Sequence, residues 1–184
     1  QEVNMRIVGV LCGKDLPPHL RQPYKKQYLQ QYVQLTGFSC LSWKDVISGL
    51  NIIHQHMSRM FKDGVMHDWL ASEFQEHVAL DISSQYFTQK KSVNSSSSIP
   101  FNAQVDPKGI LTKLIDDGWI HTADNTVGYY QTTETGNEKC IKANPAMFRI
   151  GDIVEADVGF IAIPQDGHYR MGLVLRELTL VNSS

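Results

Sequence analysis

Residues 154–177 read VEADVGFIAIPQDGHYRMGLVLRE, two runs of apolar and β-branched residues on either side of a PQDG turn. Such runs around a turn rich in Pro, Asp and Gly are typical of a β-hairpin. A four-residue PQDG loop would set Ile163 opposite His168. In that register the large apolar side chains share one face, and Glu155 lies opposite Arg176 as an attractive cross-strand pair. We therefore expect a long antiparallel ribbon in the C-terminal part of the chain.

Two glycines interrupt this ribbon, and the same register sets Gly159 opposite Gly172. Glycine inside a strand marks a bend, a bulge or the close approach of another group. One interpretation is the strong bend of a ribbon in a small barrel. The other is a slot where a base, a peptide or a planar ligand lies on bare backbone, flanked by His168, Arg170 and Arg176. The sequence leaves both open.

The N-terminal part of the chain predicts helices. The clearest is SWKDVISGLNIIHQHMSRMFKDG, residues 42–64, which has one apolar stripe at helical spacing and a capping serine, Ser42. Further helices are expected over residues 66–78 and 23–35. The last of these carries a tyrosine at every fourth position: Tyr24, Tyr28 and Tyr32. Helices joined by short turns should pack antiparallel.

A serine-rich stretch, KKSVNSSSSIP, follows these helices. It cannot bury enough apolar surface to offset its ordering entropy, so we expect a loop or linker over residues 92–100. It would separate a helical region, 1–91, from a helix-plus-sheet region, 101–184, or connect two parts of a single domain. The later region starts with a helix over 106–118, for which Asp-Pro is a good beginning.

The predicted fold class is α+β, with N-terminal antiparallel helices followed by a C-terminal antiparallel sheet. The coiled ribbon and the segment FRIGDIVEADVGF favour an OB-like, partly open barrel. Such barrels bind single-stranded nucleic acid or an extended peptide across one face. We therefore expect a non-enzymatic binding module that needs no cofactor. Its predicted ligand-binding residues are glycines, basic side chains and tyrosines: Gly159, Gly172, His168, Arg170, Arg176, Tyr129, Tyr130 and Tyr169. The tyrosines are either stacking residues or ordinary half-buried sheet aromatics.

Composition narrows the choice of partners. The net charge of −2 and the pI near 6.4 argue against a broad cationic surface for duplex DNA. No apolar run reaches the roughly 18 residues that a membrane span needs, so no membrane partner is expected. Three widely spaced cysteines, Cys12, Cys40 and Cys140, form no metal or disulfide pattern and indicate a reducing, intracellular compartment, nuclear or cytoplasmic.

Two alternatives to a nucleic-acid or protein binder stay open. Iron and 2-oxoglutarate oxygenases use two histidines and one carboxylate on a barrel, and His121, Asp124 and His168 could supply such a set. The spacing H-x-x-D differs from the H-x-D of those enzymes, and Arg170 follows His168 more closely than their downstream basic residue does. The second alternative is a homo-oligomer formed through the apolar helical stripes.

The segment GWIHTADNTVGYY, followed by GDIVE and VLR strands, resembles a family of predicted proteins from mushroom-forming fungi. Those proteins share an I-H-T-x-D-N-x-V-x-Y-Y pattern. The resemblance covers the C-terminal part of the chain well and the N-terminal part only in outline. It implies a eukaryotic intracellular protein and carries no activity. His121, Asp124 and Asn125 belong to the shared pattern, which an Asp-Asn turn held by side-chain hydrogen bonds would explain.

Overall fold

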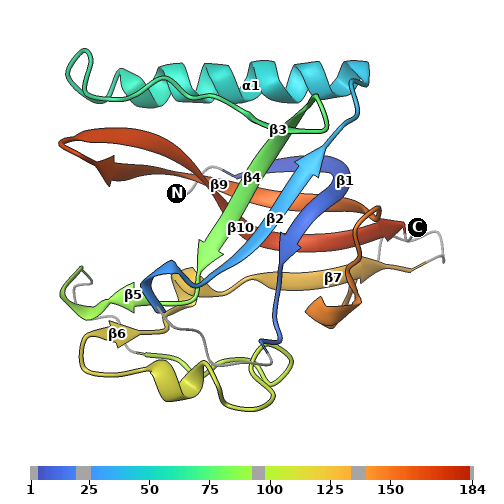
Figure 1. The fold of residues 1–184 in the computed structure, drawn as a ribbon, viewed down its shortest axis with the longest axis vertical. Helices are drawn as coiled ribbons and strands as arrows, with labels where there is room; N and C mark the ends of the chain where they lie inside the picture. The colour runs from blue at the N-terminus through green and yellow to red at the C-terminus, as the bar shows by residue number, and fades with distance from the viewer. Residues whose placement is uncertain (1–3, 20–25, 93–97, 134–139, 183–184) are drawn as a thin grey trace.

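A closed barrel of five strands forms the centre of the molecule (Figure 1). The computed structural model describes residues 4–19, 26–92, 98–133 and 140–182. The barrel strands are β1 (Met5–Asp15), β2 (Gln30–Thr36), β4 (His77–Gln85), β9 (Ile153–Gln165) and β10 (His168–Asn182). Antiparallel pairs join β4 to β2, β2 to β1, β1 to β9 and β9 to β10. A parallel contact between Val174 of β10 and Ser83 of β4 closes the barrel.

Shorter elements extend the barrel. β3 (Ser72–Phe74) forms a hairpin with β4, while β7 (Gly128–Thr132) adds to β10 in parallel and carries β8 (Cys140–Lys142). β5 (Thr88–Gln89) and β6 (Trp119–Ile120) pair as a separate two-stranded ribbon. The helix α1 (Leu41–Ser58) lies across one end of the barrel (Figure 1). Single 3-10 turns occupy Lys26–Tyr28, Lys90–Ser92, Thr112–Leu114, Ala123–Asn125 and Pro145–Met147.

The prediction of a helix after Ser42 is confirmed, although its start and end differ. The helix begins at Leu41 with Cys40 as its N-cap, and no side chain caps it. Its apolar stripe packs on the barrel rather than on another helix. Trp43 and Leu50 are buried, and four partly buried neighbours contact the same core: Val46, Ile47, Ile53 and Met57.

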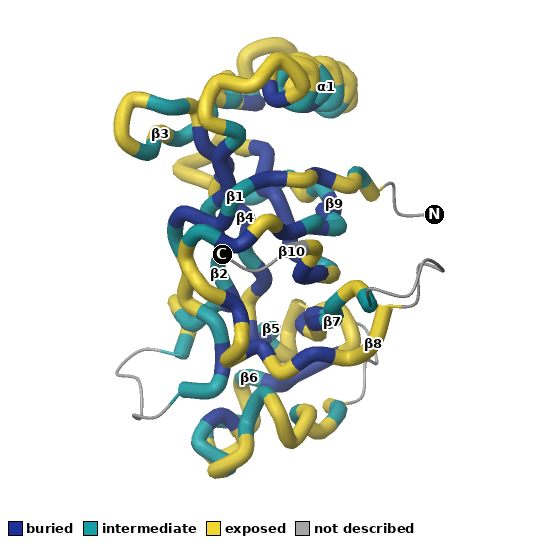
Figure 2. The backbone as a smooth tube through the Cα atoms, turned by 90° about the vertical axis from the view of Figure 1, so that its right-hand side faces the viewer, coloured by how far each residue is buried: buried dark blue, intermediate teal, exposed yellow. Residues whose placement is uncertain are grey.

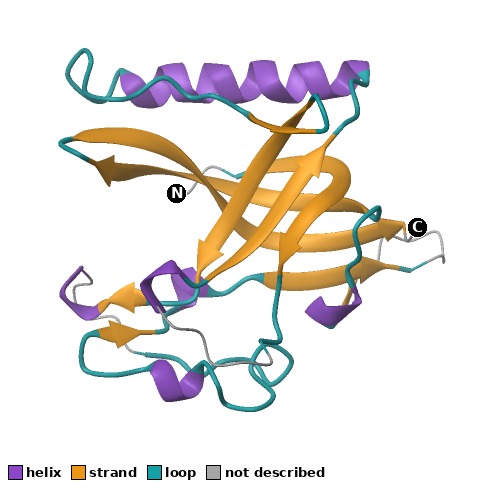
Figure 3. Ribbon diagram, in the orientation of Figure 1, coloured by secondary structure: helices purple, strands orange, loops and turns teal. Residues whose placement is uncertain are grey.

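The other predicted helices are wrong, as the strands in Figure 3 show. Residues 66–78 contain a loop and the β3–β4 hairpin, whose turn residues Gln75 and Glu76 both have positive φ. Residues 30–36 form β2, so Tyr28 and Tyr32 lie in a 3-10 turn and a strand, and Tyr24 falls outside the described residues. Residues 106–118 hold only one 3-10 turn. Barrel pairing overrides the local helical spacing at these positions.

The core lies inside the barrel, where the strands alternate buried and outward residues (Figure 2). In β2, Val33 and Leu35 are fully buried while Tyr32 and Gln34 point outward. A smaller hydrophobic cluster of Tyr86, Phe87 and Leu111 lies beyond the end of β4. Strands from both sides of the predicted linker share one sheet; residues 93–97 of that linker are outside the described part of the chain.

The predicted ribbon of residues 154–177 is confirmed, but its register is wrong by two residues. Gln165, not Ile163, lies opposite His168, because the turn has two residues rather than four. Asp166 and Gly167 both have positive φ, at 50° and 80°, as a tight hairpin turn that matches the strand twist requires. A shift of two residues keeps the side chains on their predicted faces.

The predicted glycine pair and charge pair do not form. Gly159 lies opposite Val174, and Gly172 lies opposite Ile161. A Cβ atom on Gly172 would come within 2.4 Å of Ile163 Cδ1, so side chains fill the expected slot. A bulge between Leu175 and Glu177 removes Arg176 from the ladder and leaves Glu155 opposite Thr179.

Candidate functional site

A large groove of about 1200 Å³ runs along the outside of the barrel. Its floor is the outer face of β2 and β4, and its walls are the β9–β10 hairpin and residues 68–71. Its lining combines aromatic, polar and charged side chains. The lining residues include Gln30, Tyr32, Asp68, Trp69, Asp81, Ser83, Gln85, Asp124, Phe160, Arg170 and Arg176.

The floor of the groove follows from strand alternation. The outward residues of β2 meet those of β4 in register, with Gln30 opposite Gln85 and Tyr32 opposite Ser83. The Tyr32 hydroxyl donates a hydrogen bond of 2.7 Å to Asp81 Oδ1. Burial, together with this bond, raises the pKa of the Tyr32 phenol, so the ring carries a neutral hydroxyl at physiological pH. The ring is therefore held in one orientation on a polar surface.

The wall of the groove is built by pairing the hairpin tip with residues 65–67. The Tyr169 amide donates to the Val65 carbonyl, and the His67 amide donates to the Tyr169 carbonyl, each at 2.8 Å. The Phe61 and Tyr169 rings lie 4.7 Å apart, and the His67 and His168 rings stack at 4.8 Å. These contacts fix the start of the segment 68–71, which carries Trp69 to the groove.

The charges in the groove are nearly balanced. Arg170 and Arg176 come from β10, while Asp68, Asp81 and Asp124 line the groove as carboxylates. Arg176 Nη1 donates a 2.8 Å hydrogen bond to the Asp124 carbonyl, which fixes the direction of the guanidinium. Arg176 follows Arg170 by six positions along the strand, so their Cα atoms are at most ~20 Å apart.

The predicted ligand-binding residues divide into two groups. Gly172, Arg170 and Arg176 line the groove. The other five lie elsewhere: Gly159, Tyr129, Tyr130, His168 and Tyr169.

Each of the tyrosines outside the groove has a local partner. Tyr129 is buried; its hydroxyl donates to Gln31 Oε1 at 2.8 Å, and its ring contacts Phe148. Tyr130 is half-buried, and a Cβ on Gly128 would lie 2.7 Å from its ring. Tyr169 packs on Phe61 at the hairpin tip. The three tyrosines therefore pack and hydrogen-bond within the fold, outside the groove.

The predicted metal set is not brought together. His121 is buried, its Nδ1 donates to the Tyr86 carbonyl at 2.8 Å, and its ring stacks on Phe101. Burial lowers the pKa of His121 and outweighs the opposing effect of that hydrogen bond. His168 stacks on His67 at the hairpin tip instead. Within the described residues, no three His, Cys, Asp or Glu side chains converge as metal ligands.

The I-H-T-x-D-N pattern of residues 120–125 forms a tight turn. Asn125 is buried, and its Oδ1 accepts hydrogen bonds from the Thr122 amide, the Thr122 hydroxyl and the Thr88 hydroxyl. Its carbonyl accepts a bond from Gln31 Nε2 at 3.1 Å. The turn joins the β5–β6 ribbon to the barrel and presents the Asp124 carbonyl to Arg176.

The sequence patterns do not predict the aromatic lining of the groove. Helical spacing predicts helices at Tyr32 and Trp69, and the ribbon register predicts Phe160 on the apolar face. Alternation in QQYVQLT, with Val33 and Leu35 inward, is the signal that could have placed Tyr32 on an outer strand face. No comparable signal marks Trp69, because its position depends on the contact between residues 65–67 and the hairpin tip.

The topology defines the class of fold. Five strands joined as β1-β2-β4-β10-β9, with β4 and β10 in parallel, make an OB-like barrel. No family model matches the chain, and no curated protein matches it in sequence. Among solved structures the chain is similar to gp2.5, a single-stranded DNA-binding protein encoded by bacteriophage T7. The identity is 9%, the TM-score is 0.55, and the match covers 100% of this chain and 88% of that one.

A second similar structure is the single-stranded DNA-binding protein from bacteriophage Enc34 in complex with ssDNA. Its identity to this chain is 8% and its TM-score is 0.49, with 98% of this chain and 87% of that chain covered. At these identities the comparisons show the fold alone. Among the described helices, none is long and apolar enough to cross a membrane.

Proposed function

We propose that this protein binds single-stranded nucleic acid in the groove between the β2–β4 face and the β9–β10 hairpin. OB barrels bind oligonucleotides across their second and third strands and beside the loop between the fourth and fifth. Here those strands are β2 and β4, and that loop is the tip of the β9–β10 hairpin. The similarity to a T7 protein that is named for binding single-stranded DNA supports this proposal.

The observation that carries the proposal is the pairing of aromatic and cationic side chains in one groove. Tyr32, Trp69 and Phe160 offer faces on which successive bases stack, and such stacking tolerates any sequence. Arg170 and Arg176 lie along β10, where they contact phosphates. This combination favours nucleic acid over a protein partner, because an extended peptide lacks both the repeated planar groups and the regular negative charge.

The carboxylates shape how the strand lies. Asp81 sits beside Tyr32 on the floor, so phosphates are repelled from that side and kept near the arginines of β10. Among the described residues that line the groove, Arg170 and Arg176 are the two cationic ones that can contact phosphates. Binding should therefore depend on stacking more than on counterion release. The three cysteines form no disulfide, which fits a reducing compartment, so we place the protein inside the cell.

The salt dependence of binding tests this arrangement. We expect the plot of log K against log salt to have a slope near −1.4 for a short oligothymidylate that fills this groove alone, about −0.7 for each of two phosphates. The double variant Arg170→Ala/Arg176→Ala should bind this oligonucleotide more weakly, and the slope of log K against log salt should be near zero. Fluorescence anisotropy with a labelled oligonucleotide, read at several salt concentrations, measures both quantities.

The matched control is Arg6→Ala/Arg149→Ala, which removes the same charge from exposed positions outside the groove. It should retain the affinity and slope of the unmodified protein. Equal slopes for the two double variants would contradict the assignment of Arg170 and Arg176, and an absence of binding at low salt would reject the function.

A further inference from the structure

A second, smaller groove of about 330 Å³ lies on the β5–β6 ribbon. Its lining is basic and aromatic, with a single carboxylate. The lining residues are Gln89, Lys90, Lys91, Asp117, Gly118 and Trp119. None of them lines the main groove.

Strand pairing brings the lysines to the tryptophan. Gln89 of β5 lies opposite Trp119 of β6, and the Lys90 amide donates to the Gly118 carbonyl at 3.0 Å. Lys90 and Lys91 therefore begin the 3-10 turn that follows β5, directly beside Trp119. Both lysine side chains are exposed.

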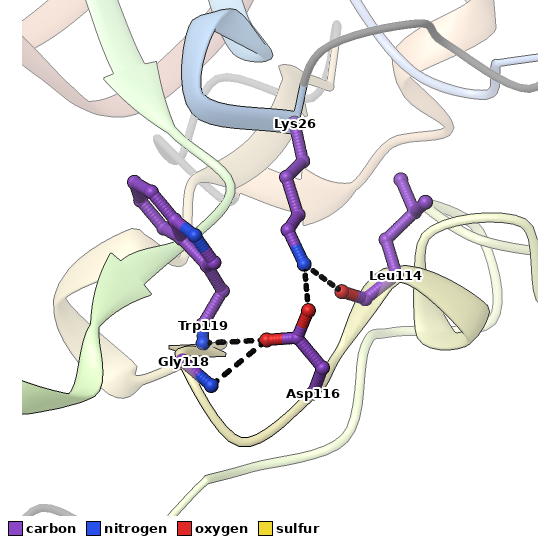
Figure 4. Close-up of polar contacts among 5 residues, drawn as sticks. All are labelled: Lys26, Leu114, Asp116, Gly118 and Trp119. Atoms are coloured by element: carbon purple, nitrogen blue, oxygen red, sulfur yellow. Dashed lines mark hydrogen bonds and ion pairs between the residues drawn. The ribbon is translucent and has the colours of Figure 1, made fainter.

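Hydrogen bonds anchor the backbone at Trp119, as Figure 4 shows. Asp116 Oδ1 accepts hydrogen bonds of 2.9 Å from the amides of Gly118 and Trp119. The indole is half-buried and packs on the cluster around Tyr86 and Phe87. A partly exposed ring that packs on a core cluster is a suitable stacking platform, because packing restricts its rotamers and less side-chain entropy is lost when a base covers it.

The nearby charges leave the two lysines available. Lys26 is committed, since its ammonium contacts the Asp116 carboxylate and the Leu114 carbonyl (Figure 4). No ion pair joins Lys90 or Lys91 to another described residue. With Asp117 as the one carboxylate lining this groove, its formal charge is +1, whereas the main groove carries −1.

The two grooves lie close together along the chain. Gln85 at the end of β4 lines the main groove, and Gln89, four positions later, lines the second, so their Cα atoms are at most about 14 Å apart. The β5–β6 ribbon and the projecting β9–β10 hairpin also lie on the same side of the barrel in Figure 1. A single-stranded nucleic acid that leaves the main groove past Gln85 would reach the second groove next.

We infer that the second groove binds the continuation of the same single strand, with one base on Trp119 and the flanking phosphates on Lys90 and Lys91. This inference rests on the proposed function of the main groove. It extends the footprint beyond the barrel face, onto the connection between the third and fourth barrel strands. It also adds cationic contacts where the main groove has few.

The length of the bound oligonucleotide tests the inference. Oligothymidylates from about 4 to about 16 nucleotides cover the range of site sizes of single OB folds. Short ones fill the main groove alone, so the Lys90→Ala/Lys91→Ala variant should bind them as the unmodified protein does. With longer ones the unmodified protein should gain roughly tenfold in affinity from an added stacked base and its phosphates, and the variant should not.

The control is Lys108→Ala/Lys113→Ala, two exposed lysines in the same part of the chain that line neither groove. It should show the full gain with length. If the affinity of Lys90→Ala/Lys91→Ala rises with oligonucleotide length as much as that of the unmodified protein, the second groove does not bind nucleic acid. The proposed function of the main groove would still stand. If no oligonucleotide of any length binds at low salt, both proposals are overturned.

Discussion

The double variant Tyr32→Ala/Trp69→Ala should lose single-stranded DNA affinity by roughly 30-fold or more. Each base stacked on an aromatic side chain contributes ~1–3 kcal/mol, so two contacts contribute about 2–6 kcal/mol if they add. Tyr32 lies on the strand face of the groove and Trp69 on the adjoining loop, so they would hold different bases. Fluorescence anisotropy with a labelled oligothymidylate measures the loss.

Phe38→Ala provides the control for this effect. Phe38 is an exposed aromatic residue beside His77, outside the groove. Its removal should leave affinity unchanged, and circular dichroism of all three proteins should show that the barrel persists. An affinity of the double variant within twofold of the unmodified protein would exclude stacking on these two rings.

Phe148→Ala should destabilise the fold by about 3–5 kcal/mol. Phe148 is fully buried, contacts the Tyr129 ring at 5.9 Å between centroids, and lies at the entry to β9. Truncation removes its buried area and leaves a cavity where β7 and β9 meet the core. Because a domain of this kind has only about 5–15 kcal/mol of stability, the loss is a large fraction of the total.

Chemical denaturation with urea, followed by circular dichroism, gives the free energy of unfolding for this test. Ile150→Ala is the comparison, since Ile150 is 52% exposed two residues later. It should cost less than about 0.5 kcal/mol. Similar losses for the two variants would mean that Phe148 is not packed as described.

The sequence predicts the parts of the fold that local patterns specify. The PQDG ribbon forms because its two runs are bulky and alternate around a turn that accepts positive φ. The helix α1 forms because its apolar stripe is long and continuous. The register error arose at Asp166 and Gly167, since a two-residue turn and a four-residue loop share the same sequence and preserve the same faces.

The failures concern segments whose structure depends on distant partners. Tyr28 and Tyr32 are four positions apart. Residues at that spacing share one face of a helix, but they also share one face of a strand, because strand side chains alternate every two residues. Only pairing with β1 and β4, from either side in the sequence, selects the strand. The residues of the candidate site differ in the same way. The ribbon pattern alone predicts Arg170 and Arg176, whereas Tyr32 and Trp69 reach the same groove only through pairing with distant segments.

Amide chemical-shift mapping by NMR tests the central claim most directly. Titration of isotope-labelled protein with a short oligothymidylate should shift residues of β2 and β4 on the outer face, residues 68–71, and the β9–β10 hairpin around Arg170. The far end of the barrel, beneath the middle of α1, should stay unchanged. Shifts confined to α1 or to β7 and β8, with the β2–β4 face silent, would show that the strand binds elsewhere and that the groove is not the interface.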